Sequence, residues 1–312
     1  MTGDARVRRD AGPTLRLRLR DVSLDLHPGR PLLMGVVNAS PESFFEGGRR
    51  RDLEALVEQG HELAAQGAEI IDVGGESSVT HLQPVSAGEE ARRAVPVIER
   101  LAAGGLIVSV DTWKAGVARA ALDAGAAMVN DVSGLRDPAL AEVCASSGAA
   151  LVVTHTRAAP KVKAFPGYAD VGADVLELLR ERIGVARERG VADDQLVLDP
   201  GPDLSKTPAE TVEALRGLGA LRALGRPILL AVSRKDFVGA VTHRPPRERL
   251  AGTLAAVGEG VDGGASIVRT HDVAAVADFM GVRRVLRGEK RLRSDARLEE
   301  SLRRDEPAAA DR

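Results

Sequence analysis

The chain has 312 residues, of which 44% are hydrophobic and 2% aromatic, and its formal net charge is −2. This length suits one α/β barrel, and the near-neutral charge argues against a nucleic-acid partner. No apolar run approaches the roughly 20 residues of a membrane span. The N-terminal segment MTGDARVRRDAG lacks the apolar core of a signal peptide. We therefore expect a cytoplasmic protein that contacts neither nucleic acid nor membrane.

The first patterned segment predicts a small hairpin. Residues 14–26 alternate apolar with charged or polar residues, and His27-Pro28-Gly29 supplies a turn. We expect this hairpin to close the bottom of the larger fold that follows.

Eight short apolar runs come next, and nearly every one ends on a side chain able to do chemistry. The stretches between them are amphipathic and of helix length, and capping patterns mark helix starts at Ser86 and Thr207. Eight strand–helix repeats predict an α/β fold, a (β/α)8 TIM barrel, whose active site lies at the C-terminal ends of the strands. The runs are LLMGVVN (32–38), EIIDVGGE (69–76), LIVSVD (106–111), AMVND (127–131), ALVVTH (150–155), QLVLD (195–199), ILLAVSRK (228–235) and SIVRTH (266–271).

The end of the chain differs in composition from the barrel. From residue 283 onward charged residues dominate, which predicts the end of a last helix and then a disordered tail. The expected organisation is an N-terminal segment with the hairpin (1–30), the barrel (31–287) and the charged tail (288–312). The only cysteine, Cys144, is expected to face the core from a helix.

One group of strand-end residues suits a flat heterocycle. Carboxylate and amide oxygens accept hydrogen bonds from ring N–H and amino groups, and an amide also donates to a carbonyl oxygen. A lone buried Asp is more often structural, so the inference depends on several of them meeting at one barrel mouth. The residues are Asp72, Asp111, Asn130 and Asp199, with Lys235 on a neighbouring strand end.

A second group is cationic and suits a diphosphate. Arg269 and His271 alternate along the last run, so they share one face, and barrels often bind phosphate after strands seven and eight. Ser233 and Arg234 end the seventh run, and Asn38 offers an oxygen to Mg²⁺ from the first. We expect Mg²⁺ as the cofactor. The alternative is that Arg269 only pairs with a carboxylate at the rim.

At this point the chain resembles the dihydropteroate synthase family, which joins a dihydropterin diphosphate to para-aminobenzoate. The resemblance runs from about Leu32 to Leu286. Each matching segment is short, but all of them occur in the family's order. They are NASPESFFEGG, IDVGGES, SVDTWK, VNDVSG, LDPG, VSRKDFVG, ERLAGTLAA and IVRTHDV.

The resemblance implies roles for the residues already singled out, and it implies a homodimer formed through the outer helices of the barrel. Three residues would take part in catalysis: Lys235, Arg269 and His271. The pterin site would be formed by Asp111, Asn130, Asp199 and Lys235. The diphosphate and Mg²⁺ would be held by Asn38, Arg269 and His271, and Ser233 with Arg234 would lie near the aminobenzoate.

The chain departs from the family where the second substrate binds. The family has an Arg where this chain has Val79, and a Phe where this chain has Leu204. His81 in the same loop as Val79 is expected to be a solvated residue, with a substrate contact as the alternative. His155 at a strand end is better placed for a contact than His27, His61 or His243, which are expected at the surface. The departures keep a second hypothesis open, a pterin-binding paralogue without synthase activity or with another amine.

Two further hypotheses come from other chemistry. A pterin-dependent methyltransferase would need a corrinoid partner, and the retained Ser-Arg-Lys and Arg-Thr-His segments disfavour it because a methyl donor releases no diphosphate. A phosphate-binding aldolase barrel would need a Schiff-base lysine, for which Lys235 is the only candidate near a strand.

Overall fold

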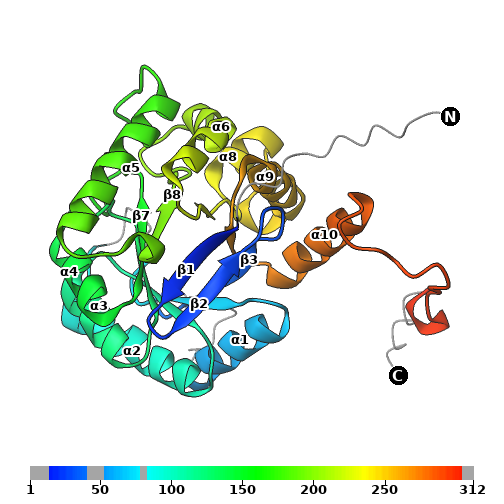
Figure 1. Cartoon of the computed structure of the whole chain (residues 1–312), viewed down its shortest axis with the longest axis horizontal. Coiled ribbons are helices and arrows are strands. Elements are labelled where there is room, and N and C mark those ends of the chain that lie inside the picture. The colour runs from blue at the N-terminus through cyan, green and yellow to red at the C-terminus, as the bar shows by residue number, and fades with distance from the viewer. Residues whose placement is uncertain (1–13, 41–52, 78–82, 304–312) are drawn as a thin grey trace.

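The computed structural model describes residues 14–40, 53–77 and 83–303, and in it eight parallel strands form a barrel. The strands neighbour one another in the order β8-β7-β6-β5-β4-β3-β10-β9, and a parallel bridge between Leu198 and Ile228 joins the two ends. The predicted (β/α)8 barrel is confirmed (Figure 1). The strands are β3 (Leu32–Asn38), β4 (Ile70–Gly74), β5 (Val108–Asp111), β6 (Met128–Asp131), β7 (Ala150–Thr154), β8 (Leu196–Asp199), β9 (Leu229–Leu230) and β10 (Ile267–Thr270).

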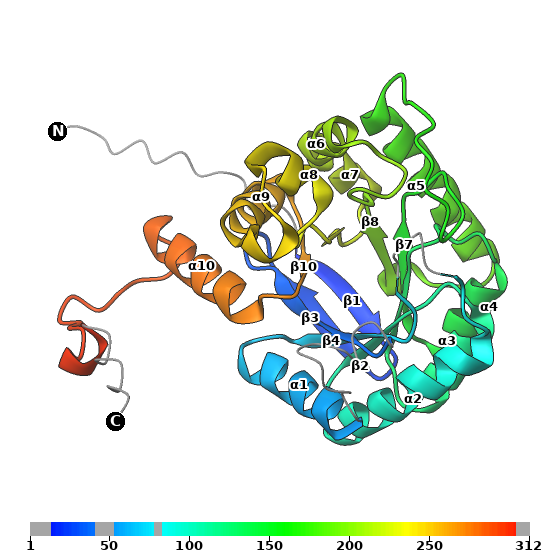
Figure 2. The ribbon, with the colours of Figure 1, turned by 180° about the vertical axis from the view of Figure 1, so that it is seen from behind.

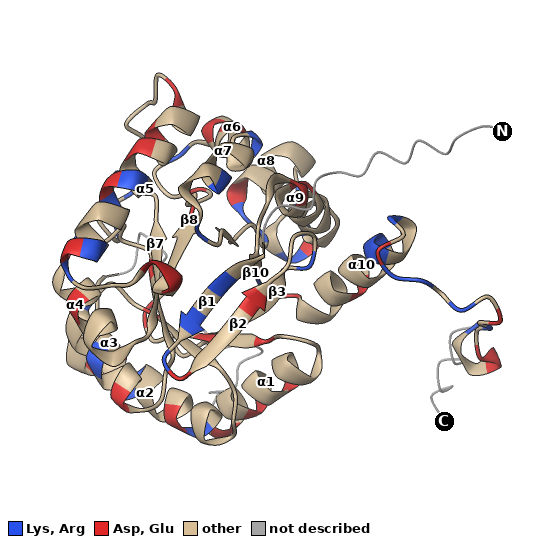
Figure 3. Cartoon of the chain, in the orientation of Figure 1, with Lys and Arg blue, Asp and Glu red and all other residues tan. Residues whose placement is uncertain are grey.

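Helices surround the strands, and their starts are capped as the sequence predicts. The Ser86 side chain accepts from the Glu89 amide, and Thr207 and Glu210 form a capping box. Figure 3 shows acidic and basic residues mixed over these outer helices. The helices are α1 (Leu53–Ala65), α2 (Ala87–Ala103), α3 (Ala115–Asp123), α4 (Ala139–Ser147), α5 (Val171–Glu188), α6 (Pro208–Arg216), α7 (Leu218–Leu221), α8 (Asp236–Thr242), α9 (Leu250–Gly263) and α10 (Val273–Leu286).

The apolar core has two parts because each strand has two faces. Residues on the outer faces pack against the helices, and Cys144 lies in this layer, fully buried, as expected. Burial raises the pKa of its thiol, so the group stays protonated. The inward-facing residues near the start of the strands form a separate inner cluster that includes Met34, Ile70 and Val197.

The predicted N-terminal hairpin completes this inner cluster. Its strands β1 (Leu15–Leu19) and β2 (Val22–Leu26) pair antiparallel and lie across the bottom of the barrel (Figure 1). Leu17, Leu19 and Leu26 are at most 3% exposed and pack on the inner cluster. The Arg18 Nε donates to the Asp194 carboxylate at 3.2 Å, so a polar contact also fixes the hairpin to the barrel.

The seventh run behaves differently from the prediction. Only Leu229 and Leu230 form strand β9. Arg234 has a left-handed backbone with φ of 57°, which ends any extended conformation, and Lys235 is the N-cap of α8. Ser233, Arg234 and Lys235 therefore stand in the turn between β9 and α8, and not on the strand.

Beyond α10 the described chain, to residue 303, contains one short 3-10 turn at Glu300–Leu302. The three proposed segments, with boundaries near residues 30 and 287, stay a prediction. No helix among the described residues is long and apolar enough to cross a membrane.

The hairpin should contribute measurably to stability. Leu17→Ala should lower the free energy of unfolding by about 2–5 kcal/mol, because it leaves a cavity between the hairpin and the barrel. Val22→Ala on the same hairpin, at a residue that is 44% exposed, should cost less than about 1 kcal/mol. Denaturant unfolding measures both variants. Equal losses would show that the hairpin does not close the core.

Candidate active site

The end of the barrel opposite the hairpin faces the viewer in Figure 2. The polar strand-end residues lie at this end. Parallel strands bring their C-terminal ends to one rim. Asp111, Asn130 and Asp199 occupy these ends at β5, β6 and β8. The neighbouring Asp131 turns away and accepts from the amides of Ser133 and Leu135 at 2.7 and 2.6 Å, so it organises the following loop.

Arg269 on β10 lies at the centre of this rim. Its Nε donates to Asp72 Oδ2 at 2.6 Å, and its Nη2 donates to Asp111 Oδ2 at 2.9 Å. The amide of Asn130 donates to the same Asp72 oxygen at 3.1 Å. The carboxylates and the arginine therefore form one network, whereas the sequence placed Arg269 in a separate cationic group. This arrangement matches the alternative prediction, in which Arg269 pairs with a carboxylate at the rim.

Two acceptor atoms in the network have no hydrogen-bond partner among the described residues. They are Asp72 Oδ1 and Asn130 Oδ1, and both are buried. A buried acceptor left without a donor costs about 1–3 kcal/mol. This cost is removed when a bound molecule supplies an N–H or amino group, so the network suits a ligand rich in such donors.

Two of the carboxylates at the strand ends, those of Asp111 and Asp199, are harder to ionise than usual. Desolvation, opposed by Arg269 and reinforced by Asp72, raises the pKa of Asp111 to about 7. Burial also raises the pKa of Asp199, whose Oδ1 accepts from the Gly201 amide at 2.7 Å. The ammonium of Lys235 acts on both carboxylates and favours their charged forms.

The turn between β9 and α8 meets the end of β10. Ser233 Oγ lies 3.0 Å from His271 Nδ1 and accepts from the His271 amide at 3.2 Å. The Arg234 Nε donates to Asp272 at 3.0 Å. Desolvation, with the charges of Arg269 and Arg234, lowers the pKa of His271 to about 4, so its ring is neutral near pH 7.

Lys206 is a functional-site residue that the sequence reasoning missed. The residue is 2% exposed, and its Nζ donates to the carbonyls of Gly201 and Leu204 at 2.9 and 3.1 Å. Burial lowers its pKa to about 7. Its contacts are to backbone carbonyls of its own loop and, at 3.3 Å, to the carbonyl of His155 after β7, and no spacing in the sequence indicates them.

His155, which the sequence favoured for contact with a ligand, is buried and structural. Its Nε2 lies 2.7 Å from Asp174 on α5, and Asp174 also pairs with Arg157 at 2.8 Å. Burial lowers the pKa of His155 to about 4, which keeps the ring neutral. The pair joins the end of β7 to the helix that follows.

A cavity of about 740 Å³ opens beside this network. Lys235 and Arg234 line one side, and Leu204 and Lys206 of the loop after β8 line another. Trp113 and the loop after β7 also line it. The volume is within the usual range for a site that takes a small organic molecule.

Asn38 ends β3 and is exposed at the rim. Its Oδ1 and the Asp111 side chain flank Gly74, where an added Cβ would lie 3.9 and 3.6 Å from them. The described residues contain no group of three or more His, Cys, Asp or Glu that could hold a metal ion. Val79 and His81 lie outside the described residues.

Proteins of known family that are similar to this chain belong to the family that its sequence motifs resemble. Residues 34–271 match the family of pterin binding enzymes. The dihydropteroate synthase of Bacillus subtilis strain 168 is 40% identical over 250 residues, covering 80% of this chain and 86% of that protein. The enzyme of the same name from Mycobacterium leprae is 41% identical over 259 residues, covering 80% and 91%.

Solved structures agree with the sequence relatives. The dihydropteroate synthase of Xanthomonas albilineans with 4-aminobenzoic acid is 40% identical and superposes with a TM-score of 0.82, covering 88% of this chain and 98% of that one. Its complex with 7,8-dihydropteroate gives a TM-score of 0.78 at 40% identity, covering 87% and 98%. The chain therefore belongs to the pterin binding enzyme family and, within it, to the dihydropteroate synthases.

Proposed function

We propose that this chain condenses 6-hydroxymethyl-7,8-dihydropterin diphosphate with para-aminobenzoate, giving 7,8-dihydropteroate and diphosphate in folate biosynthesis. The observation that carries the proposal is the buried network of Arg269, Asp72 and Asn130, whose unpartnered acceptors suit a pterin. Solved relatives that are 40% identical contain 4-aminobenzoic acid and 7,8-dihydropteroate. The family's members are transferases, and we assign this chain to the same class of enzyme.

The pterin occupies the carboxylate side of the site. Asn130 Oδ1 and the carboxylates of Asp111 and Asp199 accept from its ring N–H and amino groups. Lys235 donates to the pterin edge. Because several of these groups are buried, the ligand must replace their lost hydration with matched hydrogen bonds, which gives specificity as well as affinity.

The diphosphate lies toward the cationic side. Arg269 contributes charge and a planar set of donors, and the neutral His271 contributes one ring N–H. Ser233 fixes the orientation of His271 through their 3.0 Å contact. Asn38, exposed at the end of β3, would hold a Mg²⁺ ion through its side-chain oxygen, and the ion would supply positive charge that neutralises the leaving group.

The reaction needs no protein nucleophile. The bond between the pterin methylene carbon and the diphosphate oxygen breaks, and both electrons leave with diphosphate. The carboxylates of the network stabilise the positive charge left on the pterin. The amine nitrogen then bonds to the methylene carbon and loses one proton to solvent. The protein accelerates the reaction by positioning the two substrates and by its fixed charges.

The paralogue hypothesis remains the second candidate because Leu204 lines the cavity where the family has Phe. Under this hypothesis the pterin site is retained, and the chain either lacks synthase activity or uses another amine. The methyltransferase and aldolase hypotheses receive no support from relatives named dihydropteroate synthase.

The assay that tests the function follows diphosphate release. Dihydropterin diphosphate with Mg²⁺ and para-aminobenzoate should release diphosphate and form dihydropteroate in equal amounts, and chelation of Mg²⁺ should suppress the rate. Asp199→Ala should lower kcat/KM by about tenfold to a hundredfold, through loss of about 1–3 kcal/mol of pterin binding. If Mg²⁺-loaded wild-type protein forms no dihydropteroate but binds the pterin, the paralogue hypothesis replaces the synthase.

The raised pKa of Asp111 predicts a pH-dependent affinity for pterin. The ionised carboxylate is the form that accepts hydrogen bonds, so binding should weaken by up to about tenfold per pH unit below 7 and level off above 7. Calorimetry between pH 5.5 and 8.5 measures this, with proton release on binding at the acidic end. Asp111→Asn should remove the dependence, whereas Asp199→Asn should keep most of it. The reverse pattern would assign the titration to Asp199.

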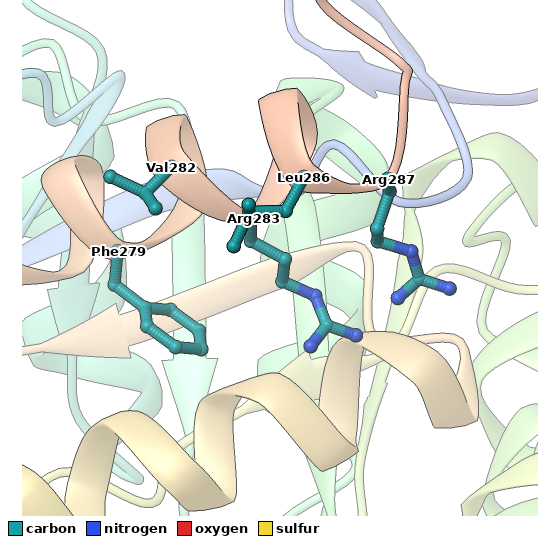
Figure 4. Close-up of a pocket in the computed structure, with 5 residues that line it drawn as sticks. All are labelled: Phe279, Val282, Arg283, Leu286 and Arg287. Carbon is teal, nitrogen blue, oxygen red and sulfur yellow. The ribbon is translucent and has the colours of Figure 1, made fainter.

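A homodimer is the expected assembly, and α10 offers a surface for it. Val282 and Leu286 are 61% and 81% exposed, and with Phe279 they line a cavity of about 520 Å³ (Figure 4). Arg283 and Arg287 pair with Asp262 of α9 and so fix α10, whereas Phe279 packs against the core and Val282 and Leu286 stay exposed. Exposed large apolar side chains one helical turn apart suit a protein interface.

The dimer proposal makes a separate prediction. Leu286→Glu should shift the protein toward monomer in sedimentation experiments, because the charge would be buried in the interface. Leu302→Glu is the matched control, since Leu302 is 67% exposed in the segment beyond the barrel. Dissociation by the control alone, or by neither variant, would place the interface elsewhere. The cytoplasmic location stays a prediction, because the N-terminal segment on which it depends lies outside the described residues.

A further inference from the structure

The loop between β7 and α5 forms a large part of the cavity wall, and nothing in the proposed mechanism yet uses it. Residues 158–165 all line the cavity. Val162 and Phe165 within this loop are 53% and 51% exposed. Large apolar side chains exposed at the edge of a cavity are unfavourable in water and become favourable when a ligand packs on them.

Lys161 holds this loop across the barrel mouth. Its side chain is 6% exposed, its Nζ lies 3.6 Å from Glu76 Oε1, and it donates to the Ser77 carbonyl after β4. Glu76 in turn pairs with Lys114 at 2.5 Å, and Lys114 pairs with Glu90 of α2 at 2.6 Å. Two lysines and two glutamates thus connect loops after β4, β5 and β7, so the position of the β7–α5 loop is fixed by buried charge.

The part of the loop beyond Lys161 presents a cation beside an aromatic ring. The Lys163 ammonium lies 5.8 Å from the centroid of the Phe165 ring. Among the other cations of the lining, Arg234 pairs with Asp272 and Lys206 donates to backbone carbonyls, and Lys235 is assigned to the pterin edge. Asp236, an acidic residue of the lining, pairs with Arg249. The surface that Lys163 and Phe165 offer suits an aromatic ring carrying an acid group.

We propose that the β7–α5 loop selects the amine co-substrate. Phe165 packs on the aromatic ring, Lys163 attracts its carboxylate, and Lys161 positions both residues. The loop thereby supplies the flat surface that Leu204 does not offer. This inference rests on the proposed function, because it names the class of amine, an aromatic amine with an acid group, that the same site accepts.

The cavity contains its own reporter. The chain has one tryptophan, and this residue, Trp113, lines the cavity. Its fluorescence can therefore follow ligand binding without turnover. Titration of pterin-saturated protein with para-aminobenzoate and with its uncharged methyl ester separates the charge contribution from the ring contribution. The wild-type protein should prefer the carboxylate, and rising salt should reduce that preference while leaving the ester unaffected.

Substitutions at three residues should then give distinct results. Lys163→Met should lower the ratio of carboxylate affinity to ester affinity by about threefold to fivefold, which is the range of an exposed ion pair. Lys163→Arg should restore the ratio. Phe165→Ala should weaken both ligands, and Phe165→Tyr should restore them. Lys161→Met should weaken both ligands and leave pterin affinity unchanged. Lys290→Met, at an exposed lysine beyond α10, is the matched control and should change nothing.

The inference and the proposed function fail in different ways. An unchanged carboxylate-to-ester ratio in Lys163→Met, with ligand binding intact, overturns the inference even if dihydropteroate is formed. Loss of the preference in Lys163→Met, together with rescue by Lys163→Arg, supports it even if no amine is turned over, in which case only the synthase assignment fails. An effect of Lys290→Met equal to that of Lys163→Met also overturns the inference, because it reduces the change to overall charge.

Discussion

The positive charge of Arg269, shared between two carboxylates, sets the charge balance at the barrel mouth. Asp72 is fully buried on β4, and the guanidinium of Arg269 on β10 bonds both to it and to Asp111 on β5. A buried carboxylate without a cation is strongly destabilising, so Arg269 offsets the free-energy cost of burying Asp72. One cation between two carboxylates leaves one negative charge in excess. That imbalance, added to desolvation, is why the pKa of Asp111 is raised to about 7.

The two ends of the barrel bury different kinds of chemical group. At the bottom the inner cluster is apolar, and the hairpin removes it from water through Leu17 and Leu19. At the mouth the strand ends carry polar groups with incomplete hydrogen bonding, among them Asn130 Oδ1. Burial at one end thus offsets the cost of polar groups at the other, and the loops of the mouth are free to vary in sequence on a fixed scaffold.

Most of the fold could be predicted from the sequence because its signals are local. Apolar runs, capping residues and the alternating hairpin each depend on residues a few positions apart. The exception is the seventh run, where Ile228 to Lys235 was expected to be one strand. There the left-handed backbone at Arg234 is set by tertiary contacts, such as the bond from its amide to Thr253 Oγ1, and no residue type in the run signals it.

The candidate site could be predicted as a list of residues but not as a network. Strand-end position identified Asp111, Asn130 and Asp199, whereas the pairing of Arg269 with Asp72 spans 197 positions and depends on the closing of the barrel. Strand-end position does not identify Lys206 or Lys161, because Lys206 reaches backbone carbonyls and Lys161 reaches the Ser77 carbonyl and Glu76 in a distant loop. Any residue type presents a carbonyl, so a sequence cannot indicate which one a lysine will reach.

The hairpin also has a consequence for how the chain is made. Leu17 and Leu19 leave the ribosome before any barrel strand, yet the surface that covers them includes Leu229 and Ile267 near the other end of the chain. At a synthesis rate of roughly 5–20 residues per second, these leucines stay exposed for tens of seconds before the residues that cover them are made. Arg16 and Arg18 are interleaved with them on β1. Charges in that pattern discourage pairing of an uncovered strand with other chains, so we expect Arg16 and Arg18 to limit aggregation of the nascent protein before Arg18 pairs with Asp194.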